Sequence, residues 1–407
     1  MFWRGIKLWR GITTNEEENA AIPPNDCEEM IIDLPPQVLE PPPQCAECCI
    51  YRVPKRLRLV NGEAYTPKLI SIGPFHHGKE ELKDMEKQKL TYYIEFLQRT
   101  ATNPRDIASI IAEKQQKIIY CYDGGLEISS QNILKIVLLD SIFIIEYFVR
   151  ATAGGENGNN HMEPEKQKPP EKKVKHFTDL IRYIYYPSPS KLPTGDAVSY
   201  VYSATKLYEA GVRFKVIEGE GGFDKIKLKK WKPLGKCQCF NFSWLLIFIP
   251  CLKCFTCLEP TQSLLYLPSF VADNRTEELY RNIMALEQCH YPLEAYLCNY
   301  MVLLDHLINT GEDVELLADK GIIVNALGSY EVVAAMVNRI AVEIVEENSC
   351  YSDVAENLQI HYEKGCNRSI GYLKSTYFSN LWRGTATVVG LIILGFTLWD
   401  FVRSTIK

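Results

Sequence analysis

Residues 329–344, SYEVVAAMVNRIAVEI, are the stretch that most clearly indicates the fold. Ser329 favours the N-cap position of a helix, because its hydroxyl can accept an unpaired backbone N–H. Behind it, apolar side chains recur at the three- and four-residue steps of one helix face; they are Val332, Val333, Met336, Val337, Ile340 and Ile344. Such a stripe packs into a core more often than it lines a cofactor site. The stretch therefore predicts an amphipathic core helix.

The helical pattern continues outward from this stretch. Residues 276–289 and 296–309 predict two further helices, and Gly311 stands where a glycine commonly ends a helix. Residues 264–270 are a candidate strand, limited by Pro268, which lacks the N–H of a ladder bond. A more N-terminal amphipathic helix is indicated by Leu82, Met85, Leu90, Tyr93 and Leu97. The predicted fold is mainly α, one large globular domain with few short strands.

Residues 133–149, ILKIVLLDSIFIIEYFV, predict a helix buried in that domain. The stretch is apolar enough to resemble a membrane span, but Lys135, Asp140 and Glu146 interrupt it. A carboxylate near the centre of a span costs about 2.5–3.5 kcal/mol on the insertion scale. In a protein core, Asp140 and Glu146 must each find a hydrogen-bond or charge partner.

Residues 385–399, TATVVGLIILGFTLW, contain no charged side chain and predict a membrane anchor. Arg383 and Arg403 flank the stretch, and a helix places them about 30 Å apart, the thickness of the hydrocarbon core. Trp382 and Trp399 then lie near the two interfaces, where such rings are enriched. We expect a single transmembrane helix over 383–403, with membrane lipid as its partner and 404–407 as its tail.

Amino-acid composition and the positions of proline, glycine and cysteine indicate how the rest of the chain is divided into segments. The 407 residues are 46% hydrophobic and 23% charged with a net charge of −5, so a globular core is expected and a nucleic-acid partner is not. Residues 1–49 are rich in proline and predicted to be disordered, and 50–382 form the helical domain. Two insertions are expected in it: a flexible one at 151–175 and a cysteine-rich, apolar one at 232–260.

The compartment is predicted from the ends of the sequence. No apolar signal region opens the chain, so the 14 cysteines are expected as reduced thiols and residues 1–382 as cytosolic. A span so near the C-terminus indicates a tail-anchored, single-pass protein of the plasma membrane or an endomembrane. Three glycosylation acceptor patterns, at Asn241, Asn274 and Asn367, would instead suit a lumenal or extracellular domain.

The cysteine-rich insertion leaves three interpretations open. Its thiols could hold a metal, could be S-acylated or otherwise contact the bilayer, or could be inert. The residues between the thiols are mostly apolar, whereas zinc modules usually carry polar turns. The cysteines concerned are Cys237, Cys239, Cys251, Cys254 and Cys257.

The sequence contains no convincing catalytic or metal-binding motif. Glu287 and His290 have the spacing of a di-iron carboxylate motif, but no second Glu-x-x-His accompanies them, so a polar network at a helix end is expected. His76 and His77 lack a cysteine or aspartate at metal-ligand spacing, and we expect a structural or exposed pair. The sequence also lacks a P-loop, His-Glu-x-x-His and Gly-x-Ser-x-Gly. It therefore predicts no catalytic, cofactor-binding or metal-ligating residue.

A distributed set of motifs resembles the plant family known as domain of unknown function 247, whose members include UPF0481-type membrane proteins. The matches include Tyr51-Arg52-Val53-Pro54, Ser71-Ile72-Gly73-Pro74-Phe75-His76-His77-Gly78, Asp140, Glu146, Asp273, Glu277, Arg281-Asn282, Glu287-Gln288-Cys289, Asp305, Asp313 and Asn348-Ser349-Cys350. The resemblance implies a plant membrane protein with an α-rich domain and no established activity or cofactor. Ser141-Ile142, where members often carry Gly-Cys, and the insertion 232–260 depart from the pattern.

Two functional hypotheses follow. In the first, the chain is a membrane-tethered recognition or scaffolding protein that binds a protein partner, whose identity and stoichiometry are left open; some grass members of the family resemble pollen-side determinants of self-incompatibility. In the second, it is an enzyme whose active site carries no recognisable motif. A concave pocket with convergent titratable side chains would favour the enzyme.

Overall fold

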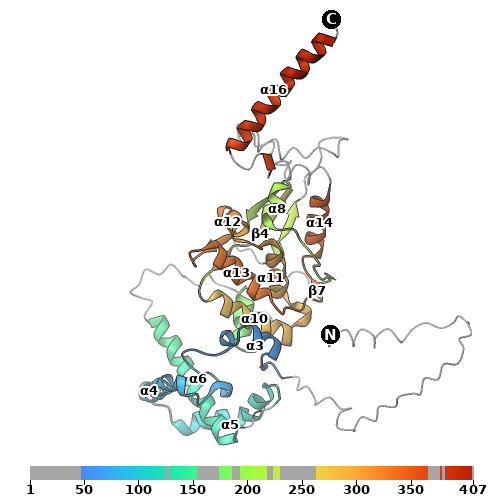
Figure 1. Ribbon diagram of the computed structural model, residues 1–407. Helices are drawn as coiled ribbons and strands as arrows, with labels where there is room; N and C mark the ends of the chain where they lie inside the picture. Colours follow the sequence, from blue (N-terminus) through green and yellow to red (C-terminus); the bar gives the residue numbers. More distant parts are fainter. Residues whose placement is uncertain are drawn as a thin grey trace, which may run out of the picture. The chain divides into compact units, whose positions relative to one another are not determined.

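The computed structural model describes residues 47–124, 126, 128–153, 174–185, 193–217, 223–229, 263–364, 376–377 and 381–405 (Figure 1). The proline-rich segment up to residue 46 and the cysteine-rich insertion 232–260 lie outside these residues, as does 154–173 of the predicted flexible insertion. The described part is mainly α with few short strands, which confirms the predicted fold class.

The first part of the described chain forms four helices, and two of them pack against the last. They are α3 (Lys55–Val60), α4 (Lys83–Thr100), α5 (Pro104–Tyr120) and α6 (Ser130–Ala153), and α4 and α5 both lie against α6. The short 3₁₀ turns η1 (Gly62–Tyr65), η2 (Pro74–His76) and η3 (Glu80–Leu82) join α3 to α4. The start of α5 follows directly from its sequence. Pro104 occupies the first turn, and the Asn103 side chain accepts a hydrogen bond from the Arg105 N–H.

The part of the chain from α7 onward builds the larger hydrophobic core. Its helices are α7 (Phe177–Tyr185), α8 (Ala204–Glu209), α10 (Thr276–His290), α11 (Tyr296–Leu307), α12 (Gly311–Asp319), α13 (Tyr330–Ala341) and α14 (Ser352–Glu363). Helix α11 contacts both α10 and α13, and most of its side chains are buried. A helix that is apolar on nearly all sides is stable only when it is surrounded.

Three small sheets accompany these helices. The strand β4 (Ser263–Leu267) lies between β2 (Val212–Val216), which is parallel to it, and β3 (Lys227–Lys229), which is antiparallel. The strand β5 (Phe270–Ala272) pairs in parallel with β6 (Ile323–Asn325), and β1 (Gly195–Asp196) pairs with β7 (Asn348–Ser349). The single strand predicted over 264–270 was therefore wrong. Pro268 separates two strands that belong to different sheets.

Two predictions about helix ends need correction. Gly311 does not end a helix. It begins α12, whose N-cap is Thr310, while α11 has already ended at Leu307. Ser329 is the N-cap residue of α13, as predicted, but its hydroxyl donates to the Glu331 carboxylate (2.6 Å) and accepts no backbone N–H.

The predicted apolar stripes are only partly buried. On α13 the side chains of Val333, Met336, Val337 and Ile340 are buried, but Val332 is 50% exposed and Ile344 lies beyond the helix end. On α4 the prediction of Leu90 in the stripe was wrong, since Leu90 is exposed and the neighbouring Lys89 is fully buried.

The predicted core helix at 133–149 is confirmed within α6, where one face is buried together with Asp140 and Glu146; its buried apolar residues are Ile133, Ile136, Leu139, Ile142 and Phe143. Farther along, Ile145 and Tyr147 are about half exposed.

The last helix, α16 (Leu381–Thr405), contains the predicted anchor. Within the described residues, its stretch Trp382–Thr405 is the one helix long and apolar enough to cross a membrane, and none of it is buried against the rest of the structure.

Candidate functional site

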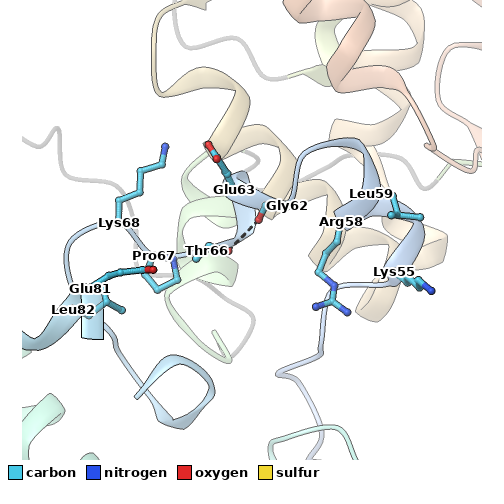
Figure 2. Close-up of a pocket in the computed structure, with 10 residues that line it drawn as sticks. All are labelled: Lys55, Arg58, Leu59, Gly62, Glu63, Thr66, Pro67, Lys68, Glu81 and Leu82. Atoms are coloured by element: carbon cyan, nitrogen blue, oxygen red, sulfur yellow. Dashed lines mark hydrogen bonds between the residues drawn. The ribbon is translucent and has the colours of Figure 1, made fainter. Parts of the chain in front are cut away.

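A concave region of 710 Å³ lies between α3, η1 and η3 (Figure 2). It is lined by Lys55, Arg58, Leu59, Gly62, Glu63, Thr66, Pro67, Lys68, Glu81 and Leu82. Figure 2 shows the Lys55 and Arg58 side chains on one side and Glu81 and Leu82 on the other, without a common point of convergence. The Thr66 hydroxyl donates to the Gly62 carbonyl (3.1 Å), and Lys68 reaches out to the Glu278 carboxylate (3.0 Å). The geometry is that of an open surface concavity with divergent charges.

The loop over residues 71–78 surrounds a buried ion pair. Gly73 has φ +81°, a backbone conformation that favours glycine. Its N–H donates to Oδ2 of Asp140 (2.7 Å), and Oδ1 of Asp140 lies 2.5 Å from Nζ of Lys89. Lys89 has no exposed surface and also donates to the Ser71 carbonyl and to Glu86 (2.7 Å). The ion pair therefore joins α4, α6 and this loop.

The Lys89 ammonium group has three protons, and its three partners match them. Burial raises the pKa of Asp140, although the hydrogen bonds from Lys89 and Gly73 oppose that shift. The donors of Lys89 and Gly73 all bind acceptors of the protein itself. We therefore infer that this ion-pair cluster holds the 71–78 loop in place.

The two adjacent histidines do not form a shared site. Burial, with Lys79 and Arg52 nearby, lowers the pKa of His76, and its Nδ1 is buried without a hydrogen-bond partner. The ring of His77 instead lies near Glu86, with Nδ1 3.8 Å from Oε2. The neighbouring Phe75 is held between the Arg52 guanidinium (4.6 Å from its ring centre) and Tyr122 (5.2 Å).

Glu287 is a fully buried carboxylate at the junction of α10, α7 and α11. Its Oε1 accepts from Nε of Arg182 (3.1 Å) and from the Leu297 N–H (3.2 Å), and its Oε2 accepts from the Cys298 N–H (2.9 Å). Burial raises the pKa of Glu287, while Arg182 and the two N–H groups oppose the shift. The carboxylate thus satisfies N–H groups in the first turn of α11, which otherwise lack intrahelical partners.

His290 lies three residues later but belongs to a different contact. Its Nδ1 is 2.8 Å from the Tyr51 hydroxyl, which also lies 3.2 Å from the Cys48 carbonyl. Glu287 and His290 therefore do not face one ligand. Across the described residues, no group of three His, Cys, Asp or Glu side chains could hold a metal ion. The cysteines of the 232–260 insertion lie outside those residues.

Burial also raises the pKa of several cysteine thiols. It raises the pKa of Cys49 to about 12, with the neighbouring Cys121 adding to the shift, and the pKa of Cys289 and Cys350 to about 11. The thiolate is the nucleophilic form, so each of these thiols must lose its proton before it reacts. The sequence did not predict that Cys49 and Cys121 are neighbours, because they are 72 positions apart and no local pattern links them.

Two further carboxylates tie distant segments together. Burial disfavours the charge of Glu277, but hydrogen bonds from Arg339, Asn61 and Arg281 outweigh it and lower its pKa to about 2. Asp313 accepts from the backbone and hydroxyl of Thr205 (2.8 and 2.7 Å) as well as from the start of its own helix. Both residues occur in the motif set quoted above, but their partners could not be read from spacing.

Comparison with known proteins identifies the family. The chain matches the family model described as a plant protein of unknown function over residues 50–164 and 155–396. It is 23% identical over 436 residues to UPF0481 protein At3g47200 of Arabidopsis thaliana, covering 86% of this chain and 85% of that protein. Putative UPF0481 protein At3g02645 of the same plant is 33% identical over 99 residues, which cover 24% of this chain and 19% of that protein. No solved structure matches the chain. Because the family model spans most of the sequence, including the motifs around the buried ion pairs, the chain belongs to the DUF247 family of plant proteins.

Proposed function

We propose that this protein is tethered to a membrane by α16 and that its folded domain acts in recognition or scaffolding of a protein partner. The observation that best supports a membrane anchor is the exposure of α16. Trp382 is 83% exposed, and the apolar side chains between it and Trp399 lie open along the helix. A continuous apolar helix of this length is unfavourable in water and suits a hydrocarbon core.

The contrast with α6 supports this proposal. Helix α6 is almost as long and also strongly apolar, but its middle is covered by α4 and α5, and Asp140 and Glu146 have partners there. Within the described residues, α16 has neither a covering element nor a charged residue between Arg383 and Asp400. Lipid is the environment that fits such a helix.

A recognition role is supported by how the polar residues are used. The buried carboxylates Asp140, Glu287 and Asp313 and the partly buried Glu277 each bind protein donors from other segments. The concave region of Figure 2 is open, and its charged side chains diverge. Binding sites for small substrates are usually enclosed, with a few convergent polar groups. A surface that binds another protein needs no such convergence.

A charge placed in the middle of α16 tests the anchor. Ile393 is midway between Arg383 and Arg403, whereas Val402 is adjacent to Arg403. Arginine at the centre of a span costs about 2.5–3.5 kcal/mol and much less at the interface. We expect I393R, and truncation after Trp382, to move most of the protein into the carbonate-soluble fraction, and V402R to stay in the pellet. A truncated chain that still pellets as an integral protein would place the membrane contact elsewhere.

Proximity labelling tests the recognition role separately. The full chain is compared in native plant membranes with a chimera that keeps residues 376–407 but carries an unrelated globular domain. Proteins labelled reproducibly by the full chain and not by the chimera are the expected result. Identical labelled sets would contradict recognition by the domain while leaving the anchor intact.

A further inference from the structure

Two cysteines far apart in the sequence are held side by side by the backbone. The Cys49 N–H and the Ile50 N–H both donate to the Cys121 carbonyl (3.0 and 2.8 Å), and the Asp123 N–H donates to the Ile50 carbonyl (2.9 Å). Ile50 and Tyr122 form an isolated parallel β-bridge, and Cys49 and Cys121 are the residues that precede them; Cys121 is also the C-cap of α5 (φ −70°, ψ −18°).

The spacing and side-chain contact suit a disulfide. The bridge brings the two backbones to about 4.7–4.9 Å of each other at Ile50 and Tyr122, within the range of about 4.4–6.8 Å that disulfides span between Cα atoms. The two thiols are close enough that Cys121 helps to raise the pKa of Cys49; neither is in a disulfide, and the Cys121 thiol donates to the Lys117 carbonyl (3.3 Å). Cys49 is 3% exposed, whereas Cys121 is partly accessible to solvent. In the part of the chain described, backbone hydrogen bonds hold no second cysteine pair in this register.

We propose that Cys49 and Cys121 form a disulfide when the protein meets a pool of low-molecular-weight disulfide such as oxidised glutathione. The Cys121 thiolate attacks one sulfur of the small disulfide, a mixed disulfide forms, and one small thiolate leaves. Cys49 then loses its proton to solvent and attacks the Cys121 sulfur, and the second small thiolate leaves. Both small thiolates take up protons, so two protein thiols are oxidised and one small disulfide is reduced.

The bond would close a chain segment that contains the loop 71–78 and helices α3, α4 and α5. It would fix residues 48–50 to the turn after α5, next to the ion pair between Glu47 and Lys117 (3.1 Å). A cross-link over such a long segment restricts the unfolded chain strongly. The pair would stay reduced in the cytosol and become oxidised in the lumen or outside the cell, so its state reports the compartment of the domain.

The test uses the full chain in detergent micelles, equilibrated over ratios of reduced to oxidised glutathione and then alkylated. Trypsin releases Cys121 as the one cysteine of peptide 118–135, and Cys49 in peptide 11–52 together with Cys27, Cys45 and Cys48. Non-reducing mass spectrometry should find these two peptides linked in the wild type and in Cys48→Ser. The link should be absent in Cys49→Ser and in Cys121→Ser.

Thermal melting separates a native cross-link from an accidental one. The oxidised wild type should melt several degrees above the reduced wild type, with the same difference in Cys48→Ser and none in Cys121→Ser. Cys121 is the less buried partner, so its variant checks the result if Cys49→Ser folds poorly. A Cys121 peptide that stays unlinked in excess oxidised glutathione, or that links to Cys48 or Cys289, would overturn the proposal.

Discussion

Lys89 illustrates what a single buried charge contributes to this domain. The residue lies on α4 with no exposed surface, and its ammonium group contacts Asp140 of α6 and the carbonyl of Ser71. A buried ion pair tolerates desolvation only when its remaining donors and acceptors are satisfied. Here the Gly73 N–H completes the set by donating to Asp140. The pair therefore fixes where the 71–78 loop lies on the two helices.

Removing Asp140 should destabilise the domain strongly. Asp140→Ala leaves the Lys89 charge buried without its main partner, and we expect a loss of about 3 kcal/mol in the free energy of unfolding. Asp84→Ala on the same helix is the control, because the Asp84 side chain is exposed and its loss should change stability by less than about 0.5 kcal/mol. Denaturant unfolding measures both. Unchanged stability with lost biological activity would indicate a functional role for Asp140.

Glu277 should make stability depend on pH in the acid range. Its pKa is lowered to about 2 in the folded protein, compared with an ordinary value of 4.5. The unfolded chain therefore binds more protons between these values, so the contribution is complete above about pH 4.5 and is lost as the pH falls toward 2. Given partial exposure, its size is about 1 kcal/mol.

Glu277→Gln should remove this part of the pH dependence. Glu278→Gln is the matched control, since Glu278 is adjacent, more exposed, and paired only with Lys68 among the ion pairs described. Melting temperatures measured from pH 7 to pH 3 should converge for the wild type and Glu277→Gln at the acid end. Parallel curves over the whole range would show that the ionised form of Glu277 adds no stability.

At the scale of one element, α12 depends on a capping arrangement that reaches outside the helix. Asp313 accepts from the Thr310 N–H (3.2 Å) and the Asn309 N–H (3.1 Å), and its other oxygen binds Thr205 at the start of α8. The same carboxylate thus satisfies N–H groups at the start of two helices. The capping box alone is visible in the sequence, because Thr310 and Asp313 are three residues apart.

Asp313→Ala should lower the free energy of unfolding by more than the loss of an ordinary helix cap does. Loss of an N-cap costs about 1 kcal/mol of stability, and the partly buried Thr205 N–H would also lose its acceptor, so we expect a total loss of about 2–3 kcal/mol. Glu312→Ala changes an exposed carboxylate in the same first turn and should cost only a few tenths of a kcal/mol. Denaturant unfolding of the two variants compares them directly. Equal losses would mean that the link to α8 carries no stability.

At the scale of the whole molecule, a membrane anchor at α16 would leave the folded domain on one side of the membrane. We propose the cytosolic side, at the plasma membrane or an endomembrane. Of the three glycosylation acceptor patterns, Asn274 lies in the described part, where it is exposed in the turn before α10. A domain translocated into the lumen would present this site to the glycosylation machinery.

We therefore expect no change in electrophoretic mobility when the plant-expressed protein is treated with an endoglycosidase. A shift that disappears in Asn274→Gln would place the domain in the lumen or outside the cell. The redox state of Cys49 and Cys121 should then change with it, because an oxidising compartment would favour the disulfide. The two measurements are independent, and agreement between them would define the topology.

What the sequence determined by itself was local. The 3.6-residue periodicity marked α13 and the helices before it, and an uncharged run with flanking arginines marked α16 as long and apolar enough to cross a membrane. The dispersed motifs were sufficient to predict the family. These properties depend on residues within one or two helical turns, or on identity and order alone.

Only the tertiary structure decided which face each element buries and which polar groups meet. Leu90 looked like the buried residue of α4, but Lys89 takes that place because Asp140, 51 positions away, supplies its counter-charge. Cys49 and Cys121 are neighbours because a β-bridge aligns them. Such contacts join segments whose separation leaves no trace in local spacing, and burial makes each polar group depend on a distant partner.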